Sequence, residues 1–535
     1  MQETSPSPAS ASSRWALGLL LVAMVLVGIV RWRLLDVPLE RDEGEYAHAG
    51  ALMLDGYAPY ERAYNMKFPG IYAAYAVVMS VFGETHRGIH QGLLCANLLT
   101  MLFVFLLGRA LVDEWVGVVA GTVYGAFALT PPVQGLFANA EHFVLPLALP
   151  GLVLVLRSAA SGRLVWLALG GLLLGCGLVV KQHGLFLAAF GGVYATLGFG
   201  PYGVRPVLQR AALFSVAVVL PYLITCLGLW MAGVFDVFWF WTFDYARAYL
   251  AQVPWDVAPV LFRRTAGPLF TLASIPWGLS ALGLLSPIWL PSSRRRAGFL
   301  IGLAAFSALS ICPGLFFRGH YFVLLLPAAA LLAGIGASAL AQAVARGARP
   351  AATAPIAFLA CALSLGQVLW QSREYLFEFT PTEVSRATYG FNPFPESLIV
   401  AEFIRSHTDP EDSLAVIGSE PQIYFYSERL PATSFIYTYP LVEEQPFNRQ
   451  MQEELMREVE QNAPQALVFV QFKSSWLAKP DAPKKMFLWL GRYLEDFELA
   501  LVVESDEVDT RVHEGRALSR FQDRLSQGLY VYLRK

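Results

Sequence analysis

The feature that most constrains this chain is a succession of long apolar runs. A membrane-spanning helix needs about 20 apolar residues, and about 17 to 25 are tolerated. The chain has 535 residues, of which 56% are hydrophobic and only 15% are charged, whereas soluble domains are about one quarter charged. We therefore predict an α-helical polytopic membrane protein with about eleven transmembrane helices. The candidate spans lie near residues 15–35, 89–111, 115–131, 143–157, 164–180, 184–199, 209–233, 266–290, 298–316, 321–342 and 352–371.

The sequence argues against a cleaved signal peptide, a cysteine metal site and a nucleic-acid partner. Residues 1–14 are polar and lack periodicity, which predicts a disordered tail. Arg31-Trp32-Arg33 follows the first apolar run where a cleaved signal peptide would carry small residues, so we predict a retained first span. The five cysteines lie in apolar runs without metal-ligand spacing. The net charge of −2 gives no reason to expect nucleic acid as a partner.

The loops between the apolar runs differ in charge on the two sides of the membrane. One set is short and carries little charge except arginine, including Arg109, Arg157, Arg163, Arg205 and Arg210. This pattern identifies the cytoplasmic side. We predict an inner (cell) membrane protein with a cytoplasmic N-terminus and an extracytoplasmic C-terminal domain.

The composition changes near Ser372, where charged residues become frequent. We divide the chain into the tail, a membrane domain over residues 15–371 with a first outer loop at 34–88, and a small α/β domain over residues 372–535. Its predicted helices lie near residues 394–407, 443–461 and 484–495, and its predicted strands at 414–418, 466–471, 499–503 and 529–533. The loop at 417–426 follows the first of these strands. It either binds a ligand or packs against the membrane domain.

The outer loops carry most of the polar residues that could perform chemistry. These residues are Asp42, Glu43, Glu45, Tyr46, Lys67, Glu141, His142, Lys181, His183, Arg318, His320 and Tyr321. Charged groups at membrane depth are costly and usually mark a functional site. An acid beside a reacting hydroxyl can accept its proton, and cations beside a leaving phosphate can stabilise its charge.

Several of these residues also have simple structural interpretations. Asp42 could cap a helix, with Glu45 closing the capping box. Lys181 could extend its ammonium to the membrane interface, and His142 and His320 could be polar lining. The aromatic residues between Phe238 and Tyr249 are typical of an interfacial belt, although they could also stack on sugars.

Asp42-Glu43-Gly44-Glu45-Tyr46-Ala47, followed by Lys67-Phe68-Pro69, resembles the GT-C superfamily of membrane glycosyltransferases. The similarity is greater to the branch of protein O-mannosyltransferases and lipid A aminoarabinose transferases. Arg318-Gly319-His320-Tyr321 also resembles this branch, and the resemblance covers about residues 15–345. The chain departs from the pattern at Phe68, where the family has proline, and at Met66, where the aminoarabinose transferases have an acid.

The resemblance implies transfer of a sugar from a polyprenyl-phosphate donor to a lipid, glycan or protein hydroxyl, with inversion. It assigns the base to Asp42, and it makes Glu43 and Glu141 positioning groups. Lys67, Lys181, Arg318 and His320 would neutralise the departing lipid phosphate. The other expected substrate-binding residues are Glu45, Tyr46, His142, His183 and Tyr321. A divalent metal ion is a candidate cofactor without assigned ligands, since Met66 replaces the family acid. Membrane lipids are the remaining expected partners.

Two other functions fit parts of the pattern. A lipid-linked glycan polymerase also acts on the outer face, but it relies more on arginines in its outer loops. A lipid or sugar transporter favours inverted repeats and charges near the midplane, whereas the charges here gather at one face.

Overall fold

The computed structural model describes residues 11–197, 203–344, 349–478, 481–505, 509–521 and 526–535. The predicted tail therefore lies largely outside the described residues. The chain forms two compact units, each assembled from separated segments. Unit 1 comprises residues 1–34, 92–224 and 255–378, and unit 2 comprises residues 35–91, 225–254 and 379–535. The division between domains at residue 372 stays a prediction.

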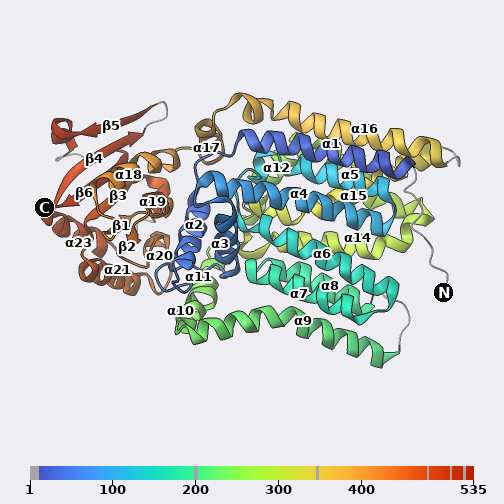
Figure 1. Cartoon of the computed structure of the whole chain (residues 1–535), viewed down its shortest axis with the longest axis horizontal. Coiled ribbons are helices and arrows are strands. Elements are labelled where there is room, and N and C mark those ends of the chain that lie inside the picture. The colour runs from blue at the N-terminus through green and yellow to red at the C-terminus, as the bar shows by residue number, and fades with distance from the viewer. Residues whose placement is uncertain (1–10, 198–202, 345–348, 479–480, 506–508, 522–525) are drawn as a thin grey trace. The chain divides into compact units, whose positions relative to one another are not determined.

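Unit 1 is a bundle of long apolar helices (Figure 1). The sequence division between the two units falls inside α4 and inside α9, so each of these helices has residues in both units. The helices of the bundle are α1 (Ala11–Arg33), α4 (His86–Leu111), α5 (Glu114–Phe127), α6 (Ala140–Ser161), α7 (Leu164–Val180), α8 (Gly184–Leu197), α9 (Val204–Met231), α12 (Ala258–Leu272), α13 (Ser274–Leu285), α14 (Pro291–Ser310), α15 (Leu326–Val344) and α16 (Arg349–Gln371).

Helices occupy the positions of the predicted spans, but how many of them cross the membrane is not confirmed. Among the described residues, six helices are long and apolar enough to cross a membrane. The pair α12 and α13, bent by 99°, would make a seventh, and four further apolar helices are shorter. The count of eleven and the orientation of the termini stay predictions.

The centre of unit 1 is α15, which packs against α5, α13, α14 and α16. Glycines permit this close approach. A Cβ at Gly283 would lie 1.9 Å from the Leu332 carbonyl oxygen, and one at Gly336 would lie 2.0 Å from that of Leu279. Small residues serve the same purpose in membrane helix pairs, where packing replaces the hydrophobic driving force.

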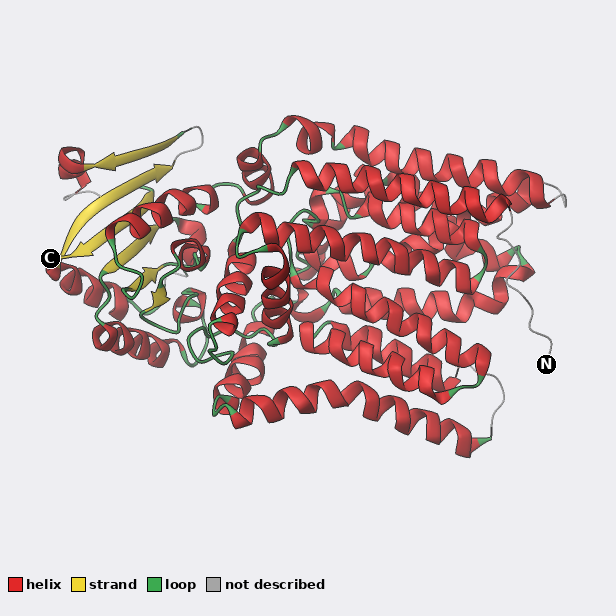
Figure 2. Ribbon diagram, viewed as in Figure 1, coloured by secondary structure: helices red, strands yellow, loops and turns green. Residues whose placement is uncertain are grey.

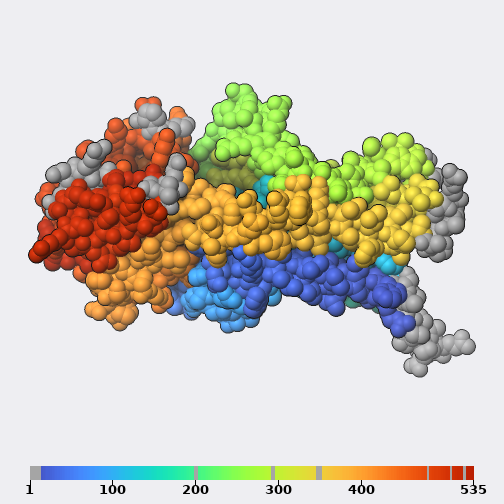
Figure 3. All heavy atoms as spheres, turned by 90° about the horizontal axis from the view of Figure 1, so that it is seen from above, coloured from blue at the N-terminus to red at the C-terminus, as the bar shows by residue number. Residues whose placement is uncertain are grey.

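The outer helices of unit 1 present large apolar side chains instead of polar ones. α1 and α16 lie side by side at its surface in both views (Figures 1 and 3). Trp15 is 76% exposed and Trp370 is 67% exposed, and Leu21, Ile29 and Phe358 are exposed as well. A soluble protein rarely exposes so much contiguous apolar surface, so this surface is suited to lipid.

Unit 2 combines the first outer loop with an α/β fold (Figure 2). Its six strands have the order β2-β1-β3-β6-β4-β5, in which β1 pairs in parallel with β2 and β3, and the other pairs are antiparallel. In register, Ala415 of β1 lies opposite Leu467 of β3. The strands are β1 (Ser413–Ile417), β2 (Leu430–Pro431), β3 (Ala466–Gln471), β4 (Phe497–Ser505), β5 (Thr510–Glu514) and β6 (Gly528–Arg534).

Helices of unit 2 come from all three of its segments. The first segment supplies α2 and α3, the second supplies α10 and α11, and the third supplies the others. These helices are α2 (Arg41–Leu54), α3 (Gly70–Phe82), α10 (Phe235–Trp239), α11 (Ala246–Leu250), α17 (Pro381–Tyr389), α18 (Phe394–His407), α19 (Gln422–Ser427), α20 (Tyr439–Val442), α21 (Asn448–Asn462), α22 (Lys473–Trp476) and α23 (Lys485–Tyr493).

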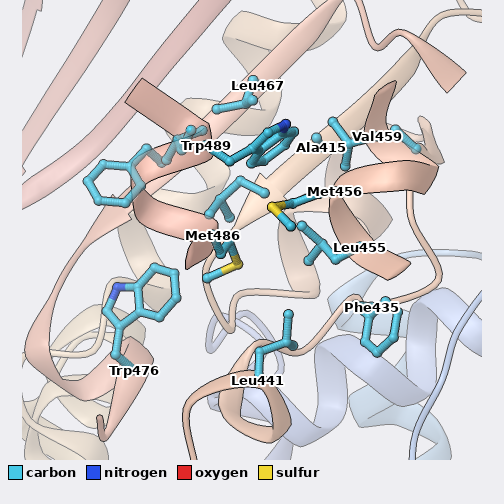
Figure 4. Packing of buried hydrophobic residues seen from close by; sticks show 14 of the residues in the cluster. Ala415, Phe435, Leu441, Leu455, Met456, Val459, Leu467, Trp476, Met486 and Trp489 are labelled. Atoms are coloured by element: carbon cyan, nitrogen blue, oxygen red, sulfur yellow. The ribbon is translucent and has the colours of Figure 1, made fainter. Parts of the chain in front are cut away.

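A hydrophobic core joins α21 and α23 to the sheet (Figure 4). Leu455 of α21, Trp489 of α23 and Leu467 of β3 all belong to this core. Trp241 and Tyr245 belong to the same cluster and are each only 3% exposed. These two aromatic residues are therefore core residues of unit 2, and the interpretation of their segment as an interfacial belt does not hold for them.

Candidate active site

The helix α2 begins at Arg41, one residue before Asp42. Glu40 is its N-cap and accepts a hydrogen bond from the Glu43 backbone N–H at 3.2 Å. The Glu43 carboxylate accepts one from the Glu40 backbone N–H at 3.0 Å, which completes a capping box. The capping role considered for Asp42 and Glu45 is therefore wrong, because the chain enters the helix earlier. Asp42 stands in the first turn, with its side chain available for other contacts.

Asp42 is held by two donors. Its Oδ2 lies 3.2 Å from the Lys67 ammonium nitrogen, and its Oδ1 accepts a hydrogen bond from the Tyr437 hydroxyl at 2.9 Å. Burial, with the nearby charge of Asp42, raises the pKa of Tyr437, so this hydroxyl keeps its proton and donates. The Asp42 side chain is still 14% exposed. This carboxylate is therefore both fixed in place and accessible.

Lys67 is fixed in turn by the loop that carries it. Its carbonyl accepts a hydrogen bond from the Tyr60 hydroxyl at 2.6 Å. Its ammonium lies 5.5 Å from the centre of the Tyr46 ring, a distance at which a cation is attracted by the ring face. The structure therefore brings together three predicted site residues, Asp42, Lys67 and Tyr46.

The other acids of α2 are fully buried. Glu43 pairs with His90 Nε2 at 2.9 Å, in addition to closing the capping box. Glu45 accepts a hydrogen bond from the Tyr72 hydroxyl at 2.7 Å. Both contacts hold α2 against neighbouring elements, which is a structural task. The catalytic role of Glu43 and the substrate contact of Glu45 stay predictions.

The loop after β1 packs against α2 within unit 2. The guanidinium of Arg41 pairs with Glu420 at 2.8 Å and also donates to the Ser419 carbonyl oxygen. A Cβ on Gly44 would lie 2.6 Å from the backbone nitrogen of Gln422, so the helix and the loop are in direct contact. This loop, which was considered as a ligand site, therefore supports the helix that carries Asp42.

A second polar cluster lies in unit 1. Glu141, in the first turn of α6, forms an ion pair with Lys181, which ends α7. The Lys181 ammonium lies 4.9 Å from the centre of the Tyr321 ring, and the His183 ring meets Tyr321 edge-on at 4.8 Å. The structure thus joins these four predicted residues around one buried ion pair.

His320 extends this cluster toward the loop before α6. Its Nδ1 lies 2.9 Å from Gln134 Oε1. Gln134 has φ +55°, in the left-handed region. Arg31, at the end of α1, donates to the Gly135 carbonyl oxygen at 2.7 Å and to that of Ala128 at 2.9 Å. The arginine therefore fixes the loop that positions His320.

Several polar atoms near this ion pair are buried without a hydrogen-bond partner in the described part of the chain. They are the side-chain oxygen and nitrogen of Asn139, Oε2 of Glu141 and both ring nitrogens of His142. Such a group costs about 1–3 kcal/mol when it is left unsatisfied, and a native protein retains it for a reason. The concentration of these atoms at the start of α6 is typical of a site built for a polar ligand.

Arg318 differs from the residues of the buried cluster in its exposure. It is exposed, and its guanidinium lies 5.4 Å from the centre of the Phe316 ring. The convergence of the unit 1 residues with Asp42 and Lys67 on one cavity stays a prediction.

The residues do not favour a metal site. In the described ranges, no three His, Cys, Asp or Glu side chains gather as metal ligands. Asp42 instead faces an ammonium and a hydroxyl. A divalent metal ion therefore stays a prediction without assigned ligands.

Three residues of the site were missed from the sequence. Tyr437 contacts Asp42 from 395 positions further along the chain, and no spacing rule links such distant segments. His90 lies in the predicted span at 89–111, and Tyr72 lies in the first outer loop, where no motif distinguishes it.

No protein-family model and no curated protein sequence matches the chain. Solved structures match over nearly its whole length. The structure of ArnT from Cupriavidus metallidurans bound to undecaprenyl phosphate has 16% identity and a TM-score of 0.56, covering 94% of this chain and 98% of that one. The Archaeoglobus fulgidus oligosaccharyltransferase tethered with an acceptor peptide has 13% identity and a TM-score of 0.54, covering 94% and 74%.

Two further structures widen the comparison. Arabinofuranosyltransferase AftD from Mycobacteria has 11% identity and a TM-score of 0.51, covering 97% of this chain and 40% of that one. The same Archaeoglobus enzyme in complex with Zn and sulfate has 11% identity and a TM-score of 0.51, covering 93% and 73%. These proteins are GT-C membrane glycosyltransferases. The chain therefore has the GT-C fold, and the resemblance predicted from its first outer loop is confirmed at the level of the fold.

Proposed function

We propose that this chain is an integral membrane glycosyltransferase that moves a sugar from a polyprenyl-phosphate carrier to an acceptor hydroxyl on the outer face. The GT-C fold supports the reaction class. Of the matching structures, ArnT is bound to undecaprenyl phosphate, and the archaeal enzyme AglB is in complex with dolichol-phosphate. The proposal extends this kind of donor to the present chain.

The observation that carries the proposal is the environment of Asp42. Among the acids of α2 it combines partial exposure with two fixed donors, Lys67 and Tyr437. A general base must be ionised, oriented and within reach of the proton it removes. The ammonium and the hydroxyl both stabilise the ionised carboxylate, and the remaining exposure leaves room for an acceptor.

The unit 1 cluster suits the leaving group. Lys181 supplies a buried cation, and its Glu141 partner can release it to a more highly charged phosphate. His142 and Asn139 offer further polar atoms at the start of α6. Preorganised groups of this kind stabilise charge that develops in the transition state.

The reaction is a single displacement. Asp42 accepts the proton of the acceptor hydroxyl while that oxygen forms a bond to the anomeric carbon. The bond from this carbon to the phosphate oxygen breaks, and its electron pair leaves with the polyprenyl phosphate. Attack opposite to the leaving group inverts the anomeric centre.

The test uses purified protein in lipid nanodiscs and a panel of polyprenyl-phosphate sugars labelled in the sugar. We expect labelled acceptor and an equal amount of free polyprenyl phosphate. A lipid-linked glycan polymerase would instead require a diphosphate-linked donor. A transporter would move the labelled lipid across a vesicle membrane without breaking the sugar–phosphate bond, and either of these results would refute the proposal.

A further inference from the structure

A large cavity of unit 1 lies away from the polar cluster described above. It measures about 960 Å³ and is lined by α4, α6, α8 and α14. Glu141 and Arg157 both belong to α6 but are about 16 residues apart, or roughly 24 Å along a helix. Because Arg157 lines the cavity and Glu141 does not, the cavity belongs to the opposite end of this helix.

The lining of this cavity is apolar over most of its surface. Leucine, valine, alanine and phenylalanine side chains form its walls, among them Leu106, Val153, Phe190 and Phe306. The volume is near the upper limit of the roughly 300–1,000 Å³ typical of ligand sites. Apolar walls in a bundle of membrane helices suit a hydrocarbon chain.

Three arginines also line the cavity, each from a different helix. Arg109 stands in the last turn of α4, Arg157 is close to the end of α6, and Arg296 is close to the start of α14. The Arg157 guanidinium lies 4.1 Å from the centre of the Trp166 ring, which holds it in place. Over the described residues, no ion pair joins any of the three to a carboxylate.

We propose that this cavity binds a phospholipid with an anionic headgroup. The acyl chain lies against the apolar walls, and the arginines bind the phosphate. The charge complementarity carries the choice of occupant, since an anionic lipid offsets part of the charge of the three arginines and a zwitterionic lipid offsets none of it. Basic pockets between membrane helices on the cytoplasmic side bind anionic headgroups in this way, and the arginine-rich loops assign this end of the bundle to that side.

The inference is independent of sugar transfer. The arginines also fit the simpler role of setting topology, so the experiment must separate lipid binding from general attraction of anionic lipid to positive charge. Arg163 is the matched control, because it is exposed, lies between α6 and α7, and does not line the cavity. Its backbone, not its guanidinium, makes the hydrogen bonds with Ser158 and Ser161.

The test is native mass spectrometry of the full chain in neutral detergent, titrated with dioleoyl phosphatidylglycerol or dioleoyl phosphatidylcholine. We expect one tightly retained phosphatidylglycerol on the wild type and weaker retention of phosphatidylcholine. Each arginine-to-glutamine change should weaken phosphatidylglycerol binding about 5-fold, and the triple variant R109Q/R157Q/R296Q about 100-fold. Arg163→Gln should leave it unchanged.

A second pair of variants tests the cavity itself while keeping every charge. Val193 lines the cavity from α8 and is partly exposed, so Val193→Trp should fill the acyl site and reduce retention without unfolding the helix. Leu185→Trp, on the same helix but outside the cavity, is its control. The proposal would be overturned if the wild type bound the two lipids equally, or if Arg163→Gln lost as much phosphatidylglycerol binding as the cavity variants. It would also be overturned if Val193→Trp bound phosphatidylglycerol as well as the wild type. Preferential retention of undecaprenyl phosphate at the same arginines would overturn the choice of occupant.

Discussion

At the scale of single residues, the first turn of α2 separates two kinds of acid. Glu43 and Glu45 are fully buried and hold the helix to its neighbours, whereas Asp42 is partly exposed between Lys67 and Tyr437. The same short motif therefore contains two structural carboxylates and one that is placed to react. Because the three acids differ in burial, substitution of Asp42 alone tests the proposed base.

The first prediction concerns the charge of Asp42. Asn has nearly the same shape as Asp but cannot accept the proton, so Asp42→Asn should lower transfer by roughly 10²- to 10⁴-fold. Because the N-cap is Glu40, the melting temperature should hardly change. Asp55→Asn, at the exposed end of the same helix, is the control and should keep wild-type turnover. Near-normal turnover of Asp42→Asn would end the assignment.

The second prediction concerns the hydroxyl of Tyr437. Tyr437→Phe removes a donor to the carboxylate, and a hydrogen bond to a charged group contributes about 1.5–3 kcal/mol. Transfer should fall about 10-fold or more, and the acid limb of the pH–rate profile should move to higher pH because the ionised carboxylate loses a stabilising partner.

Tyr439→Phe is the matched control for this change. Its hydroxyl donates to the Ser474 carbonyl oxygen at 2.7 Å, within the same segment of unit 2. That variant should leave the position of the acid limb unchanged. An unchanged limb in Tyr437→Phe as well would show that this hydroxyl does not act on the base.

At the scale of elements, the contact between α2 and the loop after β1 decides where Asp42 stands. Gly44 leaves no room for a side chain against Gln422, and Arg41 is buried between the rings of Phe394 and Tyr439. Through these contacts the C-terminal segment of unit 2 holds the helix that carries the proposed base.

The third prediction tests this contact. Gly44→Ala places a Cβ 2.6 Å from the Gln422 backbone, so α2 or the loop must shift. We expect a loss of about 1–3 kcal/mol in the free energy of unfolding, together with reduced transfer. Gly491→Ala is the control, because no atom lies within 4 Å of the added carbon in α23. Its melting temperature should stay equal or rise slightly, since Ala favours helix. Equal stability of both variants would show that the contact is not tight.

Elements with a strong local signal could be predicted from the sequence, and those that depend on distant contacts could not. The apolar runs located the helices of unit 1, and the helix at 394–407 and the strand at 466–471 were predicted with their observed bounds. β5 was missed because its residues are mostly exposed and polar. The cap was misplaced because Glu is a weak N-cap residue, whereas Asp is a strong one. Of the two partners of Asp42, Lys67 was predicted as a site residue because it lies in the same outer loop as Asp42. Tyr437 was not predicted, because it lies in a distant segment of the chain.

At the scale of the whole molecule, the proposed reaction requires a defined topology. The arginine-rich loops predict a cytoplasmic N-terminus and a C-terminal domain on the opposite side. Alkaline phosphatase and green fluorescent protein fusions after residue 350 and at the C-terminus should therefore report opposite sides. A fusion at Arg33 should agree with the C-terminal one if α1 is a span. Signals from the same side at 350 and at the C-terminus would contradict the proposed active face.

The separated segments of unit 2 also have a consequence during synthesis. Arg41 leaves the ribosome 379 residues before its partner Glu420. At about 5–20 residues per second, the two are made roughly 20–75 seconds apart. Throughout that interval the helix carrying Asp42 lacks the loop that supports it. The nascent enzyme should therefore stay inactive until its last segment has been made, and a chain that terminates early should leave no active fragment behind.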